Sequence, residues 1–80
     1  MNNNNKERYN NVFCSNLQVK ESELEDLAIK ETPLWDSVGH MTLISALEDE
    51  FDIFLEPDDM MALTSYKKGF DIMSKYGIIL

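Results

Sequence analysis

Cysteine is almost absent from this sequence of 80 residues, because Cys14 is the only one. A lone cysteine cannot form a disulfide within the chain, and no second thiol is present to complete a cysteine metal site. Long hydrophobic runs are also absent, since no apolar stretch approaches the roughly 20 residues that span a bilayer. The start of the chain is rich in asparagine and lacks the hydrophobic core of a signal peptide. We therefore expect a cytoplasmic protein with no membrane partner.

Basic residues are missing from the middle of the chain. No lysine or arginine lies between residues 31 and 66, and the whole sequence has 7 basic and 15 acidic residues, a net charge of −8. Such a charge repels nucleic acid and anionic lipid and attracts basic partners. Because neutralising phosphates requires clustered Lys and Arg, we expect no nucleic-acid partner. The acidic residues of this stretch are Glu31, Asp36, Glu48, Asp49, Glu50, Asp52, Glu56, Asp58 and Asp59.

The length of the chain predicts a single domain, residues 1–80, with a small core. A chain this short buries only about 60% of the surface that its unfolded form exposes, so an enclosed catalytic cleft is not expected. Apolar residues make up 44% and charged residues 28% of the sequence, which is ordinary for a globular protein. We expect a folded monomer with a disordered tail over residues 1–5.

Apolar residues recur at helical spacing along most of the chain. This spacing predicts a first helix over residues 5–18, a central helix over 37–51, a short helix over 57–62 and a last helix that ends at Gly77. No stretch is a credible strand. The predicted fold is all-α, a small four-helix bundle of three longer helices and one short one. The residues expected to face inward from the first, central and last helices are Tyr9, Val12, Phe13 and Leu17, then Met41, Ile44, Leu47 and Phe51, then Tyr66, Gly69, Phe70, Met73 and Tyr76.

Capping residues mark the helix ends. Asp36 is the expected N-cap of the central helix, and Thr64 or Ser65 that of the last one. Ser22 and Glu25 fit a capping box, which predicts one or two helical turns in the long connection after the first helix. The apolar residues of the connections that are expected to turn inward are Leu24, Leu27, Ile29, Leu34, Ile53 and Leu55.

Ser37 stands at the predicted start of the central helix. A nucleophilic serine needs a base and an oxyanion hole, usually in a Gly-x-Ser-x-Gly elbow that this sequence lacks. His40 has no evident orienting partner and is expected to be a surface or half-buried helix residue, so a Ser37–His40 hydrolase is disfavoured. A phosphate-linked group suits Ser37 better, because free amides and the positive end of the helix dipole favour an anion there.

The central helix ends in three acids, Glu48, Asp49 and Glu50. Carboxylates near a helix C-terminus oppose the helix dipole, typically by about 0.3–1 kcal/mol each when exposed. Folding therefore gives a weak reason for these acids, and we interpret them as a docking surface for basic partners. No metal site is expected, because the apolar residues that follow break the alternating oxygen ligands of an EF-hand.

Residues 36–51 resemble the second-helix signature of acyl carrier proteins. The resemblance lies in Asp36-Ser37-Val38, in Met41, Leu43 and Ile44, and in Ala46-Leu47-Glu48-Asp49-Glu50-Phe51. Weaker matches extend it over nearly the whole chain. Leu17-Gln18-Val19 resembles the Leu-Gly-Val that ends the family's first helix, and Leu63-Thr64-Ser65-Tyr66 takes the place of its Ile-Thr-Thr-Val.

The sequence departs from the family pattern in two places. Val38 replaces the usual leucine after the serine, which keeps an apolar side chain there. Leu34-Trp35 stands where fatty-acid carriers have Leu-Gly followed by a small residue, so the surface beside Ser37 is expected to be bulkier. Trp35 is interpreted either as a loop anchor packed on the bundle or as a recognition residue.

The resemblance implies a discrete carrier protein without catalytic activity, acting in fatty-acid or specialised-metabolite biosynthesis. In that family the serine of the Asp-Ser-Leu motif, matched here by Ser37 with Asp36 before it, receives 4′-phosphopantetheine. A phosphopantetheinyl transferase would supply this group from coenzyme A, and its thiol would carry acyl or aminoacyl groups as thioesters to enzymes with basic docking patches. The residues expected to recognise those partners are Val38, Met41, Glu48, Asp49 and Asp52.

An acyl chain that folds back between the helices would need a pocket of adaptable apolar side chains. The residues expected to line it are Met41, Ile44, Met60, Met61, Leu63 and Phe70. The rival interpretation is a small acidic interaction module that uses the same helix face with no prosthetic group. The sequence does not indicate the cargo, or whether the apolar tail over residues 78–80 packs on the bundle or on a partner.

Overall fold

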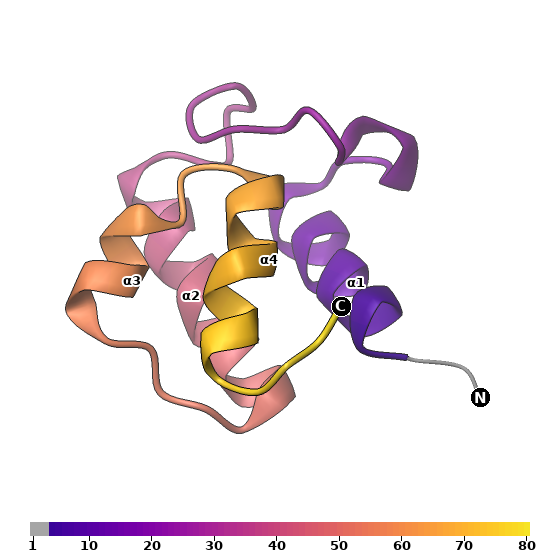
Figure 1. Cartoon of the computed structure of the whole chain (residues 1–80). Helices are drawn as coiled ribbons and strands as arrows, with labels where there is room; N and C mark the ends of the chain where they lie inside the picture. The colour runs from indigo at the N-terminus through magenta and orange to yellow at the C-terminus, as the bar shows by residue number, and fades with distance from the viewer. Residues whose placement is uncertain (1–3) are drawn as a thin grey trace.

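The computed structural model describes residues 4–80, which form a small all-helical domain (Figure 1). The helices are α1 (Asn5–Leu17), α2 (Ser37–Phe51), α3 (Pro57–Ala62) and α4 (Tyr66–Lys75), with a single 3-10 turn, η1 (Glu21–Glu23), between α1 and α2. These described residues contain no strand. The predicted helical bundle is therefore confirmed. Within the same residues, no helix is both long and apolar enough to cross a membrane.

The two ends of the described chain lie close together (Figure 1). The expected tail over residues 1–5 is wrong at its boundary, because the Asn4 carbonyl already accepts a hydrogen bond from the Arg8 amide (2.9 Å) and closes the first turn of α1. Residues 1–3 of that tail lie outside the described residues. The Asn5 side-chain amide donates to the Ile79 carbonyl (3.3 Å). Ile78 and Leu80 pack partly against the core, so the apolar tail belongs to the bundle.

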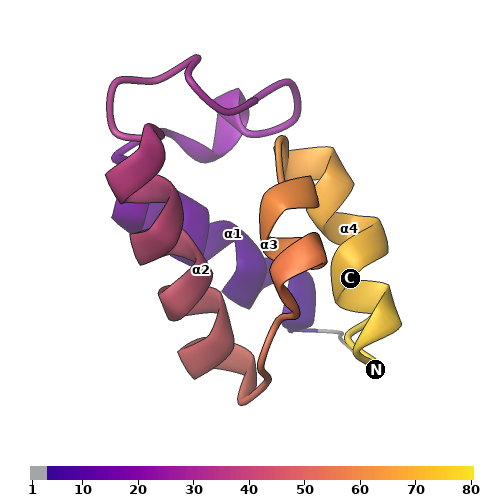
Figure 2. The ribbon, with the colours of Figure 1, turned by 90° about the vertical axis from the view of Figure 1, so that its left-hand side faces the viewer.

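One continuous core joins the helices. In both views, residues 18–36 pass over one end of the bundle and the α2–α3 connection closes the other end (Figures 1 and 2).

The first-helix prediction is confirmed, since all its expected inward residues are buried. The inward orientation expected for Leu34 is wrong, because Leu34 is 41% exposed while the next residue, Trp35, is buried. The buried apolar residues are Tyr9, Val12, Phe13, Leu17, Leu24, Leu27, Trp35, Leu43, Ile44, Leu47, Phe51, Leu55, Leu63, Tyr66, Ile72 and Met73.

The long connection is tied to the start of α4 by backbone hydrogen bonds. The Ile29 amide donates to the Thr64 carbonyl (2.8 Å), and the Tyr66 amide donates to the Leu27 carbonyl (2.9 Å). The capping box expected from Ser22 and Glu25 is wrong, because the turn that forms is η1, two residues earlier. There the Glu23 carboxylate accepts from the Lys20 amide (2.8 Å).

Helix ends otherwise follow the capping predictions. Asp36 caps α2 by accepting from the Gly39 amide (2.8 Å), and Ser65 caps α4 by accepting from the Lys68 amide (3.1 Å). Gly77 adopts the left-handed conformation (φ 82°) just beyond the end of α4, where Cβ-bearing residues are disfavoured.

Gly69 makes room on α4 for the Tyr9 side chain of α1. A Cβ atom added there would overlap the Tyr9 hydroxyl and would stand 2.8 Å from its ring carbon Cζ. Tyr9 is fully buried, and its hydroxyl donates to the Tyr66 carbonyl (2.7 Å). Burial raises the pKa of Tyr9, so the phenol remains a donor. The glycine inside α4 is thus explained by its close contact with the Tyr9 side chain of α1.

A buried carboxylate, Asp59, fastens α3 to the end of α4. It accepts from the Lys75 ammonium (2.6 Å) and from the Tyr76 hydroxyl (2.6 Å). The Tyr76 oxygen in turn accepts from the Glu56 amide (2.9 Å). Hydrogen bonds from Lys75 and Tyr76 lower the pKa of Asp59 below its usual value. The sequence did not single out this residue, because it lies in a run of acids that are otherwise exposed.

Asp59→Asn is expected to destabilise the fold at neutral pH and to matter less in acid. Because the folded-state pKa is lowered, the ionised carboxylate stabilises the fold above the unfolded aspartate pKa of about 3.9, and this contribution disappears as the pH falls through the folded value. Melting temperatures from pH 7 to pH 2 check this. The difference in melting temperature between the wild type and Asp59→Asn should begin to shrink as the pH falls below about 4 and vanish below the folded-state pKa of Asp59. Asp58→Asn, at the exposed neighbour, should differ much less from the wild type at pH 7.

Candidate functional site

Ser37 is the first residue of α2, and its side chain is exposed. The Asp36 side chain before it is also exposed and caps the helix. Ser37 opens onto a shallow hollow whose other lining residues are Val38, Met41, Thr42 and Ser45. Ser37 and its capping residue therefore lie where the sequence predicted them, at the start of the central helix.

The loop that leads into Ser37 is held tightly against the first turn of α2. The Trp35 amide donates to the Thr32 carbonyl (3.0 Å), and the Trp35 carbonyl accepts from the Lys30 amide (2.9 Å). A Cβ added at Gly39 would overlap the Leu34 carbonyl oxygen and lie 2.9 Å from its carbon. Only glycine at this position lets the loop backbone approach the helix so closely.

Trp35 anchors this loop in the core. Its side chain is 0% exposed, and its ring meets Phe13 of α1 edge-on, with centroids 5.5 Å apart. The expectation of a bulkier surface beside Ser37 is therefore wrong for Trp35, because its bulk points inward, whereas Leu34 is 41% exposed. The interpretation of Trp35 as a loop anchor is confirmed.

His40, one turn after Ser37, uses both of its ring nitrogens within the fold. Nδ1 accepts from the Trp35 indole N–H (3.0 Å). Because Nδ1 is the acceptor, Nε2 carries the proton and donates to the Met60 carbonyl of α3 (2.7 Å). The half-buried position expected for His40 is confirmed. With both nitrogens bonded elsewhere, neither has the free lone pair that a base acting on Ser37 would need.

The acids near the end of α2 do more for the fold than the sequence indicated. Glu48 accepts from the Leu55 amide (2.9 Å) and so holds the α2–α3 connection. Glu50 pairs with Arg8 of α1 (2.7 Å). The weak folding role expected for these acids is therefore wrong at Glu48 and Glu50. Asp49 and Asp52 are exposed, and their role in docking partners stays a prediction.

The exposed apolar residues of α2 gather beside Ser37. Val38 is 76% and Met41 53% exposed, and both line the hollow next to the serine. The expected inward orientation of Met41 is wrong, because Leu43 takes the core position and is fully buried. Sequence reasoning counted inward positions from Met41 at a spacing of three to four, but the buried stripe runs through Leu43, Ile44 and Leu47.

The residues expected to line an acyl pocket are spread over different environments. Ile44 and Leu63 are buried, whereas Met61 is 78% exposed. Met60 is half-buried and its carbonyl binds His40. Phe70 lines a different cavity, described next. A pocket that uses all of these side chains stays a prediction and would require the helices to move apart.

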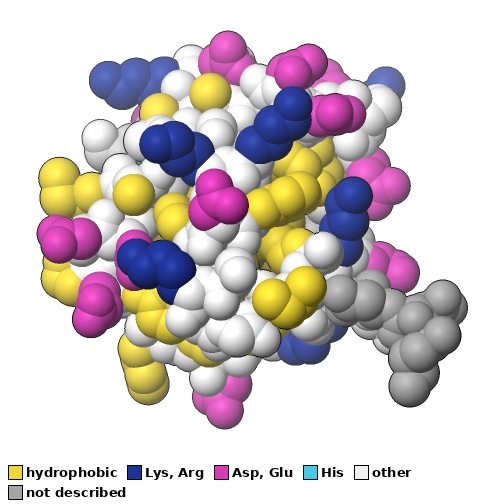
Figure 3. Space-filling view, in the orientation of Figure 1, with side chains coloured by type: hydrophobic (Ala, Val, Ile, Leu, Met, Phe, Trp, Pro, Cys, Tyr) yellow, Lys and Arg dark blue, Asp and Glu magenta, His cyan; other side chains and the backbone are white. Residues whose placement is uncertain are grey.

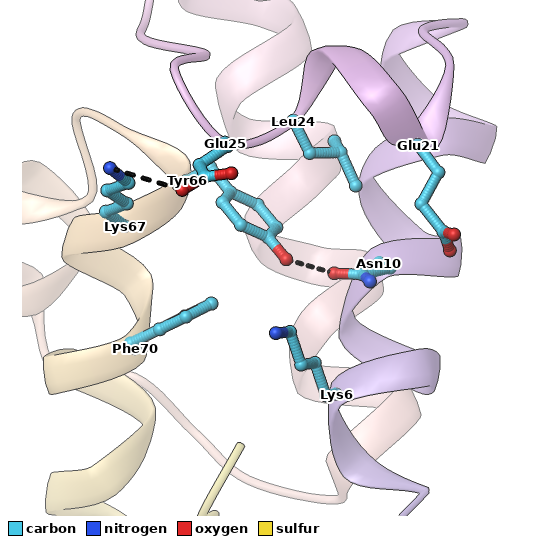
Figure 4. A pocket seen from close by; sticks show the side chains of 8 residues that line it. All are labelled: Lys6, Asn10, Glu21, Leu24, Glu25, Tyr66, Lys67 and Phe70. Atoms are coloured by element: carbon cyan, nitrogen blue, oxygen red, sulfur yellow. Dashed lines mark hydrogen bonds and ion pairs between the residues drawn. The ribbon is translucent and has the colours of Figure 1, made fainter.

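A cavity of about 270 Å³ lies between α1, η1 and α4 (Figure 4). The space-filling view shows apolar surface there, flanked by lysine and acidic side chains (Figure 3). The Tyr66 hydroxyl donates to Asn10 across the cavity, Lys67 pairs with Glu25 (3.8 Å), and the Lys6 ammonium lies 5.8 Å from the Phe70 ring centre. The cavity does not include Ser37, and sequence reasoning missed it. Its lining residues are Lys6, Asn10, Glu21, Leu24, Glu25, Tyr66, Lys67 and Phe70.

A reactive thiol and a metal site both have little support in the described part of the chain. Burial, with Glu21 and Glu23 nearby, raises the pKa of the Cys14 thiol, which makes it a poor nucleophile. Over residues 4–80, no group of three or more His, Cys, Asp or Glu side chains is placed to hold a metal ion.

Comparison of the chain with models of known protein families and with curated proteins found no match. The resemblance to acyl carrier proteins therefore stays an expectation from the sequence, chiefly from the motif in residues 36–51.

Proposed function

We propose that this protein is a discrete acyl carrier protein that bears 4′-phosphopantetheine on Ser37. The observation that carries the proposal is the position of Ser37, exposed on the first turn of α2 and preceded by the capping Asp36. The first amides of a helix have no partner within it, and the helix dipole favours an anion at this end. The exposed Ser37 and the open hollow beside it leave room for a phosphodiester.

The attachment step makes limited demands on this chain. The Ser37 oxygen would form a bond to the pantetheine-side phosphorus of coenzyme A as the diphosphate bond of coenzyme A breaks, and adenosine 3′,5′-bisphosphate would leave. Because His40 is engaged by Trp35 and Met60, we expect the transferase to supply the base that takes the Ser37 proton. The terminal thiol of the attached arm would then hold acyl or aminoacyl groups as thioesters.

Partner selection would use the surface around Ser37. Val38 and Met41 offer exposed apolar contacts beside the attachment point, and Asp36, Asp49 and Asp52 offer exposed carboxylates. The net charge of −8 would speed the encounter with enzymes that carry basic docking patches. The rival function, an acidic interaction module, would use the same surface but would need no modified serine.

The proposal predicts covalent modification of Ser37 alone. After incubation with coenzyme A and a broad-specificity phosphopantetheinyl transferase, the intact wild type should gain the mass of one phosphopantetheine. Ser37→Ala should gain nothing. Ser45→Ala, a matched exposed serine on the same helix and in the same hollow, should be modified as fully as the wild type. Equal labelling of Ser37→Ala would refute the proposal, and an unmodified wild type would favour the interaction module.

A further inference from the structure

His40 joins the loop that precedes Ser37 to α3. On one side its Nδ1 accepts from the indole of Trp35, which ends that loop, and on the other its Nε2 donates to the Met60 carbonyl (2.7 Å). The two rings are nearly parallel, with centroids 6.3 Å apart and an angle of 17° between them. In Figure 2 the connection before α2 lies above the start of that helix, and α3 runs beside it.

Both partners of His40 depend on it for their hydrogen bonds. Trp35 is fully buried, so an indole N–H left without an acceptor there would destabilise the loop. Met60 lies in the last turn of α3, where carbonyls have no partner within the helix. One side chain thus satisfies a buried donor and a helix-terminal acceptor on different elements.

The elements joined in this way all expose apolar side chains. Leu34 in the loop is 41% exposed, Val38 on α2 is 76% exposed, and Met61, the neighbour of Met60, is 78% exposed. An enzyme that reaches Ser37 and contacts more than one of these elements encounters them in the arrangement that His40 fixes.

We propose that His40 is a positioning residue for the modification of Ser37. It acts through Trp35 and Met60, holding the acceptor serine, the loop before it and α3 in the arrangement that the transferase binds. This role rests on the proposed function. His40 touches neither the transferred group nor the Ser37 hydroxyl in this role, and the chemistry of transfer stays with the transferase.

The test compares His40→Leu with His40→Gln as transferase substrates. Leucine removes both hydrogen bonds, whereas the glutamine amide offers one acceptor and one donor in place of Nδ1 and Nε2. For His40→Leu we expect kcat/KM to fall by about tenfold or more, mainly through a higher KM, because displacements near 1 Å can cost this much. His40→Gln should recover most of the loss. Trp35→Phe, which keeps an aromatic ring but removes one hydrogen bond of the bridge, should shift KM in the same direction as His40→Leu.

Two further readouts separate positioning from loss of stability. Trp35 is the only tryptophan, so its fluorescence should change in His40→Leu and return towards the wild-type spectrum in His40→Gln. Ile72→Val, a core variant on α4, should lose stability but keep the wild-type KM. The inference is overturned if folded His40→Leu is modified with wild-type KM and kcat, if glutamine and leucine behave alike, or if Ile72→Val raises KM equally. An unmodified wild type would instead remove the proposed function and this role with it.

Discussion

Replacing Trp35 with alanine is expected to lower the free energy of unfolding by about 3–5 kcal/mol, the usual cost of deleting a buried large aromatic side chain. Trp35 is fully buried, packs edge-on against Phe13 and donates to His40. The deletion therefore leaves a cavity between the loop and α1, and leaves His40 Nδ1 without its donor. Small domains are stable by only about 5–15 kcal/mol, so this loss is a large share of the total.

Urea unfolding followed by helical circular dichroism measures this effect without relying on tryptophan fluorescence. Leu34→Ala is the matched control, since Leu34 is the neighbouring residue and is 41% exposed. It should change the stability by no more than about 0.5 kcal/mol. A loss below about 1 kcal/mol in Trp35→Ala would be too small for a core position and would mean that the indole does not anchor the loop.

Gly39→Ala should also destabilise the fold, although alanine is the better helix former. Propensity alone favours alanine over glycine by about 1 kcal/mol in a helix interior. Here the new methyl group would overlap the Leu34 carbonyl, which belongs to the backbone and cannot rotate away as a side chain would. Overpacking of this kind typically costs about 1–3 kcal/mol and sometimes more. Set against the propensity gain, this leaves an expected net loss of about 1–2 kcal/mol, together with slower modification of Ser37.

Ser45→Ala separates the steric effect from propensity. Ser45 is exposed on the same helix, so alanine there should leave stability unchanged or slightly higher. Thermal denaturation of both variants gives the comparison. If Gly39→Ala is as stable as Ser45→Ala, the loop does not approach the helix as closely as the Leu34 contact requires.

Much of the fold could be predicted because amphipathic periodicity and helix caps are local signals. The buried face of α1 follows directly from the spacing of Tyr9, Val12, Phe13 and Leu17. Asp36 and Ser65 marked the starts of α2 and α4, and both cap through their side chains. The position of Ser37 could be predicted because its motif lies at a helix start, which a local capping signal marks.

The remaining features depend on contacts between residues far apart in the chain. No periodicity in the loop indicates whether Leu34 or Trp35 turns inward, and the space beside Phe13 decides in favour of Trp35. Charge patterning likewise could not show that Glu50 pairs with Arg8 or that Asp59 is buried against Lys75. The glycine at position 69 is explained only by its contact with the Tyr9 side chain, which the sequence pattern does not reveal.

The sequence pattern gave a wrong prediction of which residues of α2 face the core. Val38 and Met41 continue the apolar pattern of the helix by sequence spacing, yet both are exposed because the core stripe passes through Leu43 and Leu47 instead. Exposed apolar residues beside a serine are costly for solubility and useful for binding. The departure from the predicted core therefore supports a contact surface at Ser37.

The most direct test of the account is to locate the modified residue in the wild-type chain. After reaction with coenzyme A and a phosphopantetheinyl transferase, tandem mass spectrometry of the digested protein assigns the added group to one peptide and one side chain. The account predicts one phosphopantetheine per chain, attached to Ser37. A chain that stays unmodified, or that carries the group on another serine such as Ser15 or Ser45, would contradict it.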